Sequence, residues 1–246
     1  MKIKNYTLYG VVVFLLIPLL TLAGPSDYVF TPQVTRGERE IDFKMGTAKS
    51  GGTSSDSAAS LGFGYGVSER WFTEIYAKYK RGDGKATHYD AVEWENKFQL
   101  TETGRYPVDV GLILEIERPK EDEEGWEVEW GPLFQSQVGR TQLNANFLFE
   151  RSYDSAEKSD TELLYQWQAK YLWISSLDFG LQGFGEVGKW NDWESASEQS
   201  HRMGPAIFGK QPLGGRKEIE YNAAWLFGFS DAAPDTNFRL QVEYEF

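Results

Sequence analysis

The last ten residues of the chain, Asn237-Phe238-Arg239-Leu240-Gln241-Val242-Glu243-Tyr244-Glu245-Phe246, alternate strictly between polar and apolar side chains. Alternation with a period of two predicts a β-strand with one polar and one apolar face. The apolar face ends on the terminal aromatic residue, Phe246. A strand of this kind is stable with water on one side and either lipid or a second sheet on the other.

The same alternation recurs throughout the chain and predicts twelve strands. Most of them have about 10–13 residues, the length that a tilted strand needs to cross the hydrocarbon layer. The predicted strands lie near 38–46, 57–67, 70–80, 88–100, 107–118, 126–139, 141–151, 161–173, 177–189, 200–210, 217–229 and 236–246. The strand at 200–210 has the weakest pattern, because Pro205 lies within it.

The connections between these strands alternate in length, as expected of an outer-membrane barrel with short periplasmic turns and longer external loops. The predicted loops are 49–56, 81–87, 119–125, 152–160, 190–199 and 230–236, and the turns are 67–70, 101–106, 139–140, 174–176 and 210–216. Only 210–216 is longer than expected for a turn. The order predicts an all-β fold, a closed antiparallel transmembrane β-barrel of about twelve strands.

A secreted β-sandwich would also show alternation, but two features favour the membrane barrel. The apolar faces carry almost no ionised side chain, and a polar misfit such as Asn96 is rare. A lysine or arginine at the middle of the bilayer would cost about 2–4 kcal/mol, so a face without charge is informative. Tryptophan and tyrosine residues also gather toward the strand ends on this face, as they do at membrane interfaces.

Composition excludes several classes of function. The chain has 246 residues, no cysteine, two histidines and a net charge of −12. The lack of cysteine excludes a disulfide framework, a thiol nucleophile and a cysteine-ligated metal site. The negative charge argues against nucleic acid, whose phosphates would be repelled.

The beginning of the chain predicts export from the cytoplasm of a Gram-negative cell. Lys2 and Lys4 precede an uncharged run that is too short for an ordinary spanning helix, and small residues precede a cleavage point after Ala23. We therefore predict a signal peptide at 1–23, a periplasmic N-terminal segment at 24–37 and a barrel at 38–246 in the cell outer membrane. The pattern leaves open whether 24–37 stays in the periplasm or enters the lumen.

Several short stretches carry a family resemblance. They are Asp27–Pro32, Gly37–Phe43, Gly64–Val67 and Trp71–Glu74, together with the final strand. In these stretches the chain resembles a group of uncharacterised, porin-like proteobacterial outer-membrane β-barrel proteins. The resemblance implies the fold and the location, and it brings no catalytic or binding residues.

The polar faces of the strands should line the lumen, so candidate channel residues follow from parity. We select the lumen-lining residues Glu93, Glu95, Glu115, Glu117, Glu127, Glu129, Lys170, Glu218, Glu220, Arg239 and Glu243. The remaining inward bases predicted in this way are Lys44, Lys78 and Lys97. Acids outnumber bases, which favours a narrow channel for small polar or cationic solutes. The alternative is a non-conducting scaffold barrel, whose paired charges only fill the interior.

Other chemistry is less well supported by the residues. Glu-x-Glu pairs such as Glu218 and Glu220 suit hard cations, but a solvated lumen wall is the favoured explanation for them, so we assign no metal site. An outer-membrane acyl hydrolase would need a serine–histidine pair, and neighbours such as Ser200 and His201 point to opposite faces of a strand. We therefore expect no catalytic residues and no cofactor. The expected partners are membrane lipid and lipopolysaccharide, the barrel-assembly machinery through Phe246, and small polar solutes.

Overall fold

The computed structural model describes residues 24–52, 54–156 and 159–246, so the predicted signal peptide lies outside the described residues. In the described part of the chain, no helix is long and apolar enough to cross a membrane. The only helical element there is a single 3-10 turn, η1, at Asp122–Glu124.

Twelve antiparallel strands form a closed barrel, which confirms the predicted fold class. Closure comes from the pairing of β1 with both β2 and β13, and from the pairing of β8 with β9. An additional two-residue strand, β10 (Asp192–Trp193), pairs with β9 in the connection that follows it. The barrel strands are β1 (Arg39–Ser50), β2 (Ser54–Ser68), β3 (Trp71–Arg81), β4 (His88–Gln99), β5 (Asp109–Pro119), β6 (Trp126–Val138), β7 (Thr141–Tyr153), β8 (Glu162–Ile174), β9 (Leu177–Lys189), β11 (Ser200–Gly214), β12 (Lys217–Gly228) and β13 (Thr236–Glu245).

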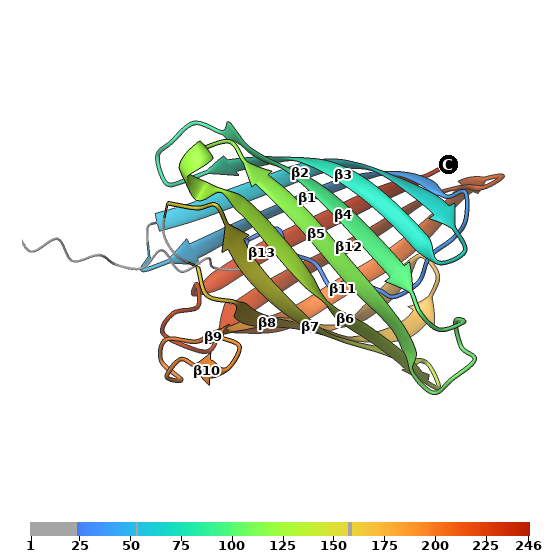
Figure 1. Ribbon diagram of the computed structural model, residues 1–246. Coiled ribbons are helices and arrows are strands. Elements are labelled where there is room, and N and C mark those ends of the chain that lie inside the picture. Colours follow the sequence, from blue (N-terminus) through green and yellow to red (C-terminus); the bar gives the residue numbers. More distant parts are fainter. Residues whose placement is uncertain (1–23, 53, 157–158) are drawn as a thin grey trace, which may run out of the picture.

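The two ends of the barrel differ in their connections. The end that carries 69–70, 100–108, 139–140, 175–176 and 215–216 is called the turn end, and the C-terminus lies there as well (Figure 1). The other connections form the opposite end, which is called the loop end. Successive connections lie at opposite ends of the barrel because neighbouring strands are antiparallel. Because the number of barrel strands is even, the C-terminus lies at the same end as the beginning of β1.

Three predicted connections were wrong in their bounds. The turn predicted at 101–106 extends over 100–108, and the other two are shorter than predicted. Most of the predicted loop 49–56 is strand, because β1 and β2 stay paired as far as Ser50 and Ser54. Likewise β11 continues to Gly214 through an irregularity in its register with β12, so a two-residue turn replaces the predicted connection 210–216. Backbone pairing continues through polar residues at both places, whereas alternation marks only the part of a strand that has an apolar face.

Side chains alternate between a buried interior and an exposed apolar exterior. On β1, Asp42 is 1% exposed, whereas the adjacent Phe43 is 40% exposed. Asn96 is a polar residue on the apolar outer face. Its Oδ1 accepts hydrogen bonds from Trp71 Nε1 and Thr73 Oγ1 on the neighbouring strand, both at 3.1 Å. A polar group can thus occupy the apolar face when it is bonded within that face.

Candidate functional site

Carboxylates lie directly opposite one another across successive strands and form a continuous row inside the barrel. We call this row the acid spiral. Its members, in spatial order, are Glu218, Glu245, Glu40, Glu74, Glu95, Glu115, Glu129, Glu150 and Glu162. Only Gly64 of β2, which is paired with both Glu40 and Glu74, interrupts the succession of acids.

The acid spiral climbs from one end of the barrel to the other. Paired residues lie roughly perpendicular to their strands, and barrel strands are tilted, so a row of pairs winds around the wall as it rises. Glu218 follows the 215–216 turn at the turn end, while Glu162 begins β8 at the loop end. The carboxylates therefore form a track along the full length of the lumen.

A second row of acids runs beside the spiral, two residues along each strand. Its members are Glu220, Glu243, Asp42, Glu93, Glu117 and Glu127. Tyr76 and Gly62 stand between Asp42 and Glu93 in this row, on β3 and β2. The interior wall formed by β12, β13 and β1–β6 is consequently dense in negative charge, and we call it the acidic wall.

Three lysines neutralise part of this charge. Lys78 Nζ lies 2.7 Å from Glu93 and also contacts Glu117. Lys210 Nζ lies 2.5 Å from both Glu218 and Glu220.

The third base, Lys44, lies deeper in the wall. Its Nζ is 3.4 Å from Asp42 and 3.9 Å from Glu95. It also lies 3.5 Å from the ring centroid of Tyr28 and 3.8 Å from that of Tyr76. Lys97 also lines the cavity beside this wall. These four lysines are fewer than the carboxylates of the two rows, so most of the carboxylates share their counter-charge.

Two groups of carboxylates on the acidic wall approach one another closely enough to hold a cation. Each group has oxygen atoms within 4.8 Å of one another. The groups are Glu93, Glu95 and Glu115, and Glu218, Glu220 and Glu245. Hard cations prefer oxygen ligands of this kind, although salt bridges to lysine already use part of both groups.

The opposite wall, built from β7, β8 and β9, is lined mainly by neutral amides, which lie between Glu150 and Glu162 at the loop end and Lys170 toward the turn end. We call it the amide wall. Gln182 Nε2 donates to Gln168 Oε1 at 2.6 Å, and Asn146 Nδ2 donates to Gln166 Oε1 at 3.2 Å. Arg239, on the neighbouring face of β13, donates to Gln182 Oε1 at 2.5 Å and to Asn222 Oδ1 at 2.6 Å. This base therefore bonds to amides and not to the acid spiral.

Residues 24–37 pass through the interior of the barrel, and we call them the lumen segment. At the loop end, Arg202 Nη2 donates to Asp27 at 3.1 Å and to the Gly24 carbonyl at 3.2 Å. Asn237 Nδ2 donates to the Pro25 carbonyl at 2.9 Å. The prediction left the position of this segment open, and the structure places it inside the lumen.

Halfway along the lumen, two adjacent residues of the segment enter separate apolar clusters. Val29 packs in a cluster with Phe184, Ala206, Phe208, Ala224 and Leu226. Phe30 packs in a cluster with Ile113, Leu133, Leu148 and Leu164. Two hydrogen bonds also fix the backbone of Phe30 to the barrel wall: Phe30 N donates to Gln166, and Asn146 donates to the Phe30 carbonyl. An apolar layer therefore crosses the middle of an otherwise polar interior.

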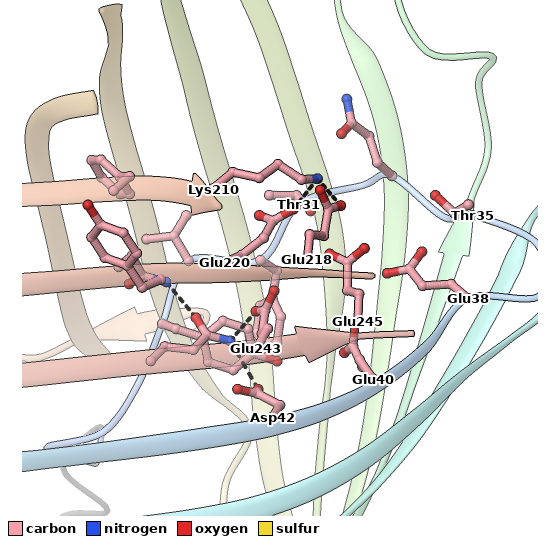
Figure 2. A pocket seen from close by; sticks show the side chains of 18 of the residues that line it. Thr31, Thr35, Glu38, Glu40, Asp42, Lys210, Glu218, Glu220, Glu243 and Glu245 are labelled. Carbon is pink, nitrogen blue, oxygen red and sulfur yellow. Dashed lines mark hydrogen bonds and ion pairs between the residues drawn. The ribbon is translucent and has the colours of Figure 1, made fainter. Parts of the chain in front are cut away.

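Below this layer, a cavity of about 640 Å³ opens toward the turn end. The lumen segment forms one side of it, and Val34 N donates to Gln99 Oε1 at 2.8 Å where the segment leaves it. Figure 2 shows Lys210 reaching Glu218 and Glu220, with further carboxylates beside them. The acids that line the cavity are Glu38, Glu40, Asp42, Glu74, Glu95, Asp178, Glu218, Glu220, Glu243 and Glu245.

The predicted site residues fall into four places. Glu93, Glu95, Glu115, Glu117, Glu127 and Glu129 lie together on β4, β5 and β6, and Glu218, Glu220 and Glu243 lie at the turn end of the acidic wall. Arg239 is bonded to the amides. Lys170 lines the cavity with its Nζ 5.4 Å from the ring centroid of Phe208.

Sequence reasoning missed two inward bases, Arg202 and Lys210, which both lie on β11. Their parity with the buried Ser200, Ala206 and Phe208 is the signal that could have found them. It was weak because small and apolar residues occupy both faces of this strand, so neither face stood out as polar.

The two histidines lie near strand ends at the loop end. His201 Nδ1 lies 2.8 Å from the Tyr165 hydroxyl, and its Nε2 lies 3.0 Å from Gln199 Oε1. His88 Nδ1 lies 3.4 Å from the Ala86 carbonyl oxygen. Both contacts of His201 leave the imidazole bonded to residues other than the adjacent Ser200.

No family model and no curated protein matches the sequence, but solved structures share its fold. An outer-membrane channel from Pseudomonas putida F1 is similar with a TM-score of 0.57 and 11% identity, over 91% of this chain and 99% of that one. The KdgM porin has a TM-score of 0.55 and 8% identity, over 84% and 99%. The translocator domain of the autotransporter NalP from Neisseria meningitidis has a TM-score of 0.53 and 13% identity, over 86% and 88%. The chain therefore has the fold of outer-membrane barrels.

Proposed function

We propose that this protein is an outer-membrane channel for small cations and small polar solutes, with the acid spiral as its conduction track. The observation that carries the proposal is the climb of carboxylates from the turn end to the loop end, which only Gly64 of β2 interrupts. A cation that leaves one carboxylate meets the next one on the neighbouring strand. Conduction needs this succession of weak sites, because a single strong site would retain the ion.

The energetics of the wall support the same proposal. Like charges placed directly opposite each other across a strand pair are destabilising, by about 0.2–1 kcal/mol for each pair. The acid spiral contains several such pairs, among them Glu218 with Glu245 and Glu74 with Glu95. Mobile cations from solution offset this repulsion, and an acid-lined tube concentrates them.

The amide wall supports a preference for small hydrated or polar solutes. Gln168 and Gln182 present hydrogen-bonding groups without net charge on the side that faces the acids. A solute between the two walls would meet charge on one side and hydrogen-bond donors and acceptors on the other. This arrangement favours cations and neutral polar molecules over anions.

Planar-bilayer recording of the refolded protein in a salt gradient tests the proposal. We expect a reversal potential of the sign that cation preference produces, and a weaker preference at high salt, because the wall charge is screened. Changing Glu127 and Glu129 to Gln should reduce this preference. A reversal potential of the opposite sign would overturn the proposal.

A non-conducting scaffold barrel is the second candidate, and one observation favours it. The lumen segment buries Val29 and Phe30 in apolar clusters at the middle of the barrel. A scaffold would show no current with or without the segment in place, whereas a channel would conduct once the segment had moved.

Location in the outer membrane is part of the same proposal. The exposed apolar exterior and the fold shared with outer-membrane barrels support it. We also propose membrane lipid and lipopolysaccharide as the surroundings of the exterior. The terminal Phe246 stacks on Tyr244 with ring centroids 5.5 Å apart, and we propose that the barrel-assembly machinery recognises it.

A further inference from the structure

We propose that the lumen segment, residues 24–37, is a built-in plug that closes the channel and must leave its seat before ions pass. This inference rests on the proposed channel function and adds its regulation. The plug precedes β1 in the same chain. It therefore enters the lumen at the turn end, where β1 begins (Figure 1). It then runs along the lumen to Gly24 at the loop end.

The wall has a track of inward glycines where the segment passes. A Cβ atom added to Gly46 would lie 1.7 Å from the Pro25 carbonyl oxygen, and one added to Gly66 would lie 1.9 Å from the Thr35 carbonyl oxygen. A Cβ atom added to Gly111 would lie 2.9 Å from the Pro32 Cβ. Since any side chain at these positions would collide with the segment, the wall is shaped to receive it.

The middle of the segment supplies the seal. Val29 and Phe30 are 7% and 4% exposed, and they are buried against different parts of the wall. Adjacent residues of an extended chain point in opposite directions, so two consecutive apolar side chains can fill the lumen from both sides. A hydrated cation would have to cross this apolar layer without oxygen ligands.

Non-covalent polar contacts hold the plug near both of its ends. Arg202 holds Asp27 at the loop end, and Gln99 holds Val34 at the turn end. In the middle, Tyr28 donates a 2.5 Å hydrogen bond to Glu95, a member of the acid spiral. The plug therefore covers the conduction track directly, and its release would return this carboxylate to passing ions.

Two glycine substitutions in the full chain test the plug without removing it. Changing both Gly46 and Gly111 to Leu should force the segment from its seat while leaving the strands paired. We expect the mean current to rise about tenfold or more, the value for a plug that is seated at least nine-tenths of the time. Ala59→Leu is the matched control, because it adds a leucine on the outward face of β2, opposite Met45, the residue before Gly46.

An engineered disulfide tests the opposite change. The chain has no cysteine, so Pro32→Cys with Gly111→Cys introduces the only thiols. The Cβ distance of 2.9 Å for this pair must widen to the usual value of about 3.8 Å, a small outward shift. We expect the oxidised variant to be closed and the reduced variant to recover a current about tenfold larger or more.

The combined outcomes separate this inference from the proposed function. A small, cation-selective current in the wild type, with a current about tenfold larger in the leucine and reduced cysteine variants, supports both. Equal current in the wild type and all variants overturns the plug and leaves the channel. No current in any variant that shows the heat-modifiable migration of a folded barrel overturns the channel. If the leucine variants lack that migration, the cysteine pair decides, and equal currents in its two redox states overturn the plug.

Discussion

In both the acidic wall and the amide wall, polar side chains point inward at every second residue of a strand. The two walls differ in how these buried polar side chains are paired. On the amide wall, neutral amides donate to one another, as in the pair Gln182 and Gln168. On the acidic wall, carboxylates such as Glu218 and Glu245 face each other across paired strands. A neutral network needs no counter-charge, whereas a row of carboxylates must either attract cations or take up protons. Under the proposed function, the acidic wall is the surface along which cations would move.

The largest expected difference between the walls concerns their bases. Lys78→Met leaves Glu93 and Glu117 without their nearest cation and should cost about 2–5 kcal/mol. Arg239→Met leaves only neutral amides unpaired, so it should cost about 1–3 kcal/mol. Urea unfolding of the refolded barrel, followed by tryptophan fluorescence, measures both. A smaller loss for Lys78→Met than for Arg239→Met would show that the acids do not depend on this lysine.

The outer faces of the two walls should respond alike, because lipid contacts both. Ile75, outside the acidic wall, and Phe147, outside the amide wall, are 59% and 48% exposed. Lysine at either position should cost about 2–4 kcal/mol and impair insertion. Heat-modifiable migration on a gel reports the folded fraction. Tolerance of Ile75→Lys alone would mean that lipid does not cover that side.

The smallest expected effect concerns repulsion within the acid spiral. Glu245 lies opposite both Glu218 and Glu40, so Glu245→Gln should stabilise the barrel by about 0.2–1 kcal/mol. The gain should shrink as salt screens the charges. Gln168→Glu, a new charge on the amide wall, should have the opposite sign. A urea midpoint that falls for Glu245→Gln would show that its charge is already compensated.

Much of the barrel was predictable because alternation is a local property. The strand at 126–139 was predicted within one residue of β6, and the inward parity of Glu127 and Glu129 follows from it. Where apolar residues gave way to polar ones, as at 47–57, the pattern could not show that β1 and β2 remain paired. Ladder hydrogen bonds depend on the partner strand, which local sequence does not identify.

The sequence by itself determined the alternation, the number of barrel strands and the face on which each acid lies, because side-chain direction in a strand depends only on parity. The tertiary structure alone decided that these acids form a spiral, since their succession depends on register and tilt across paired strands. It also decided the course of residues 24–37. Nothing in Val29 or Phe30 specifies a partner, because the apolar clusters that receive them come from strands far apart in the chain.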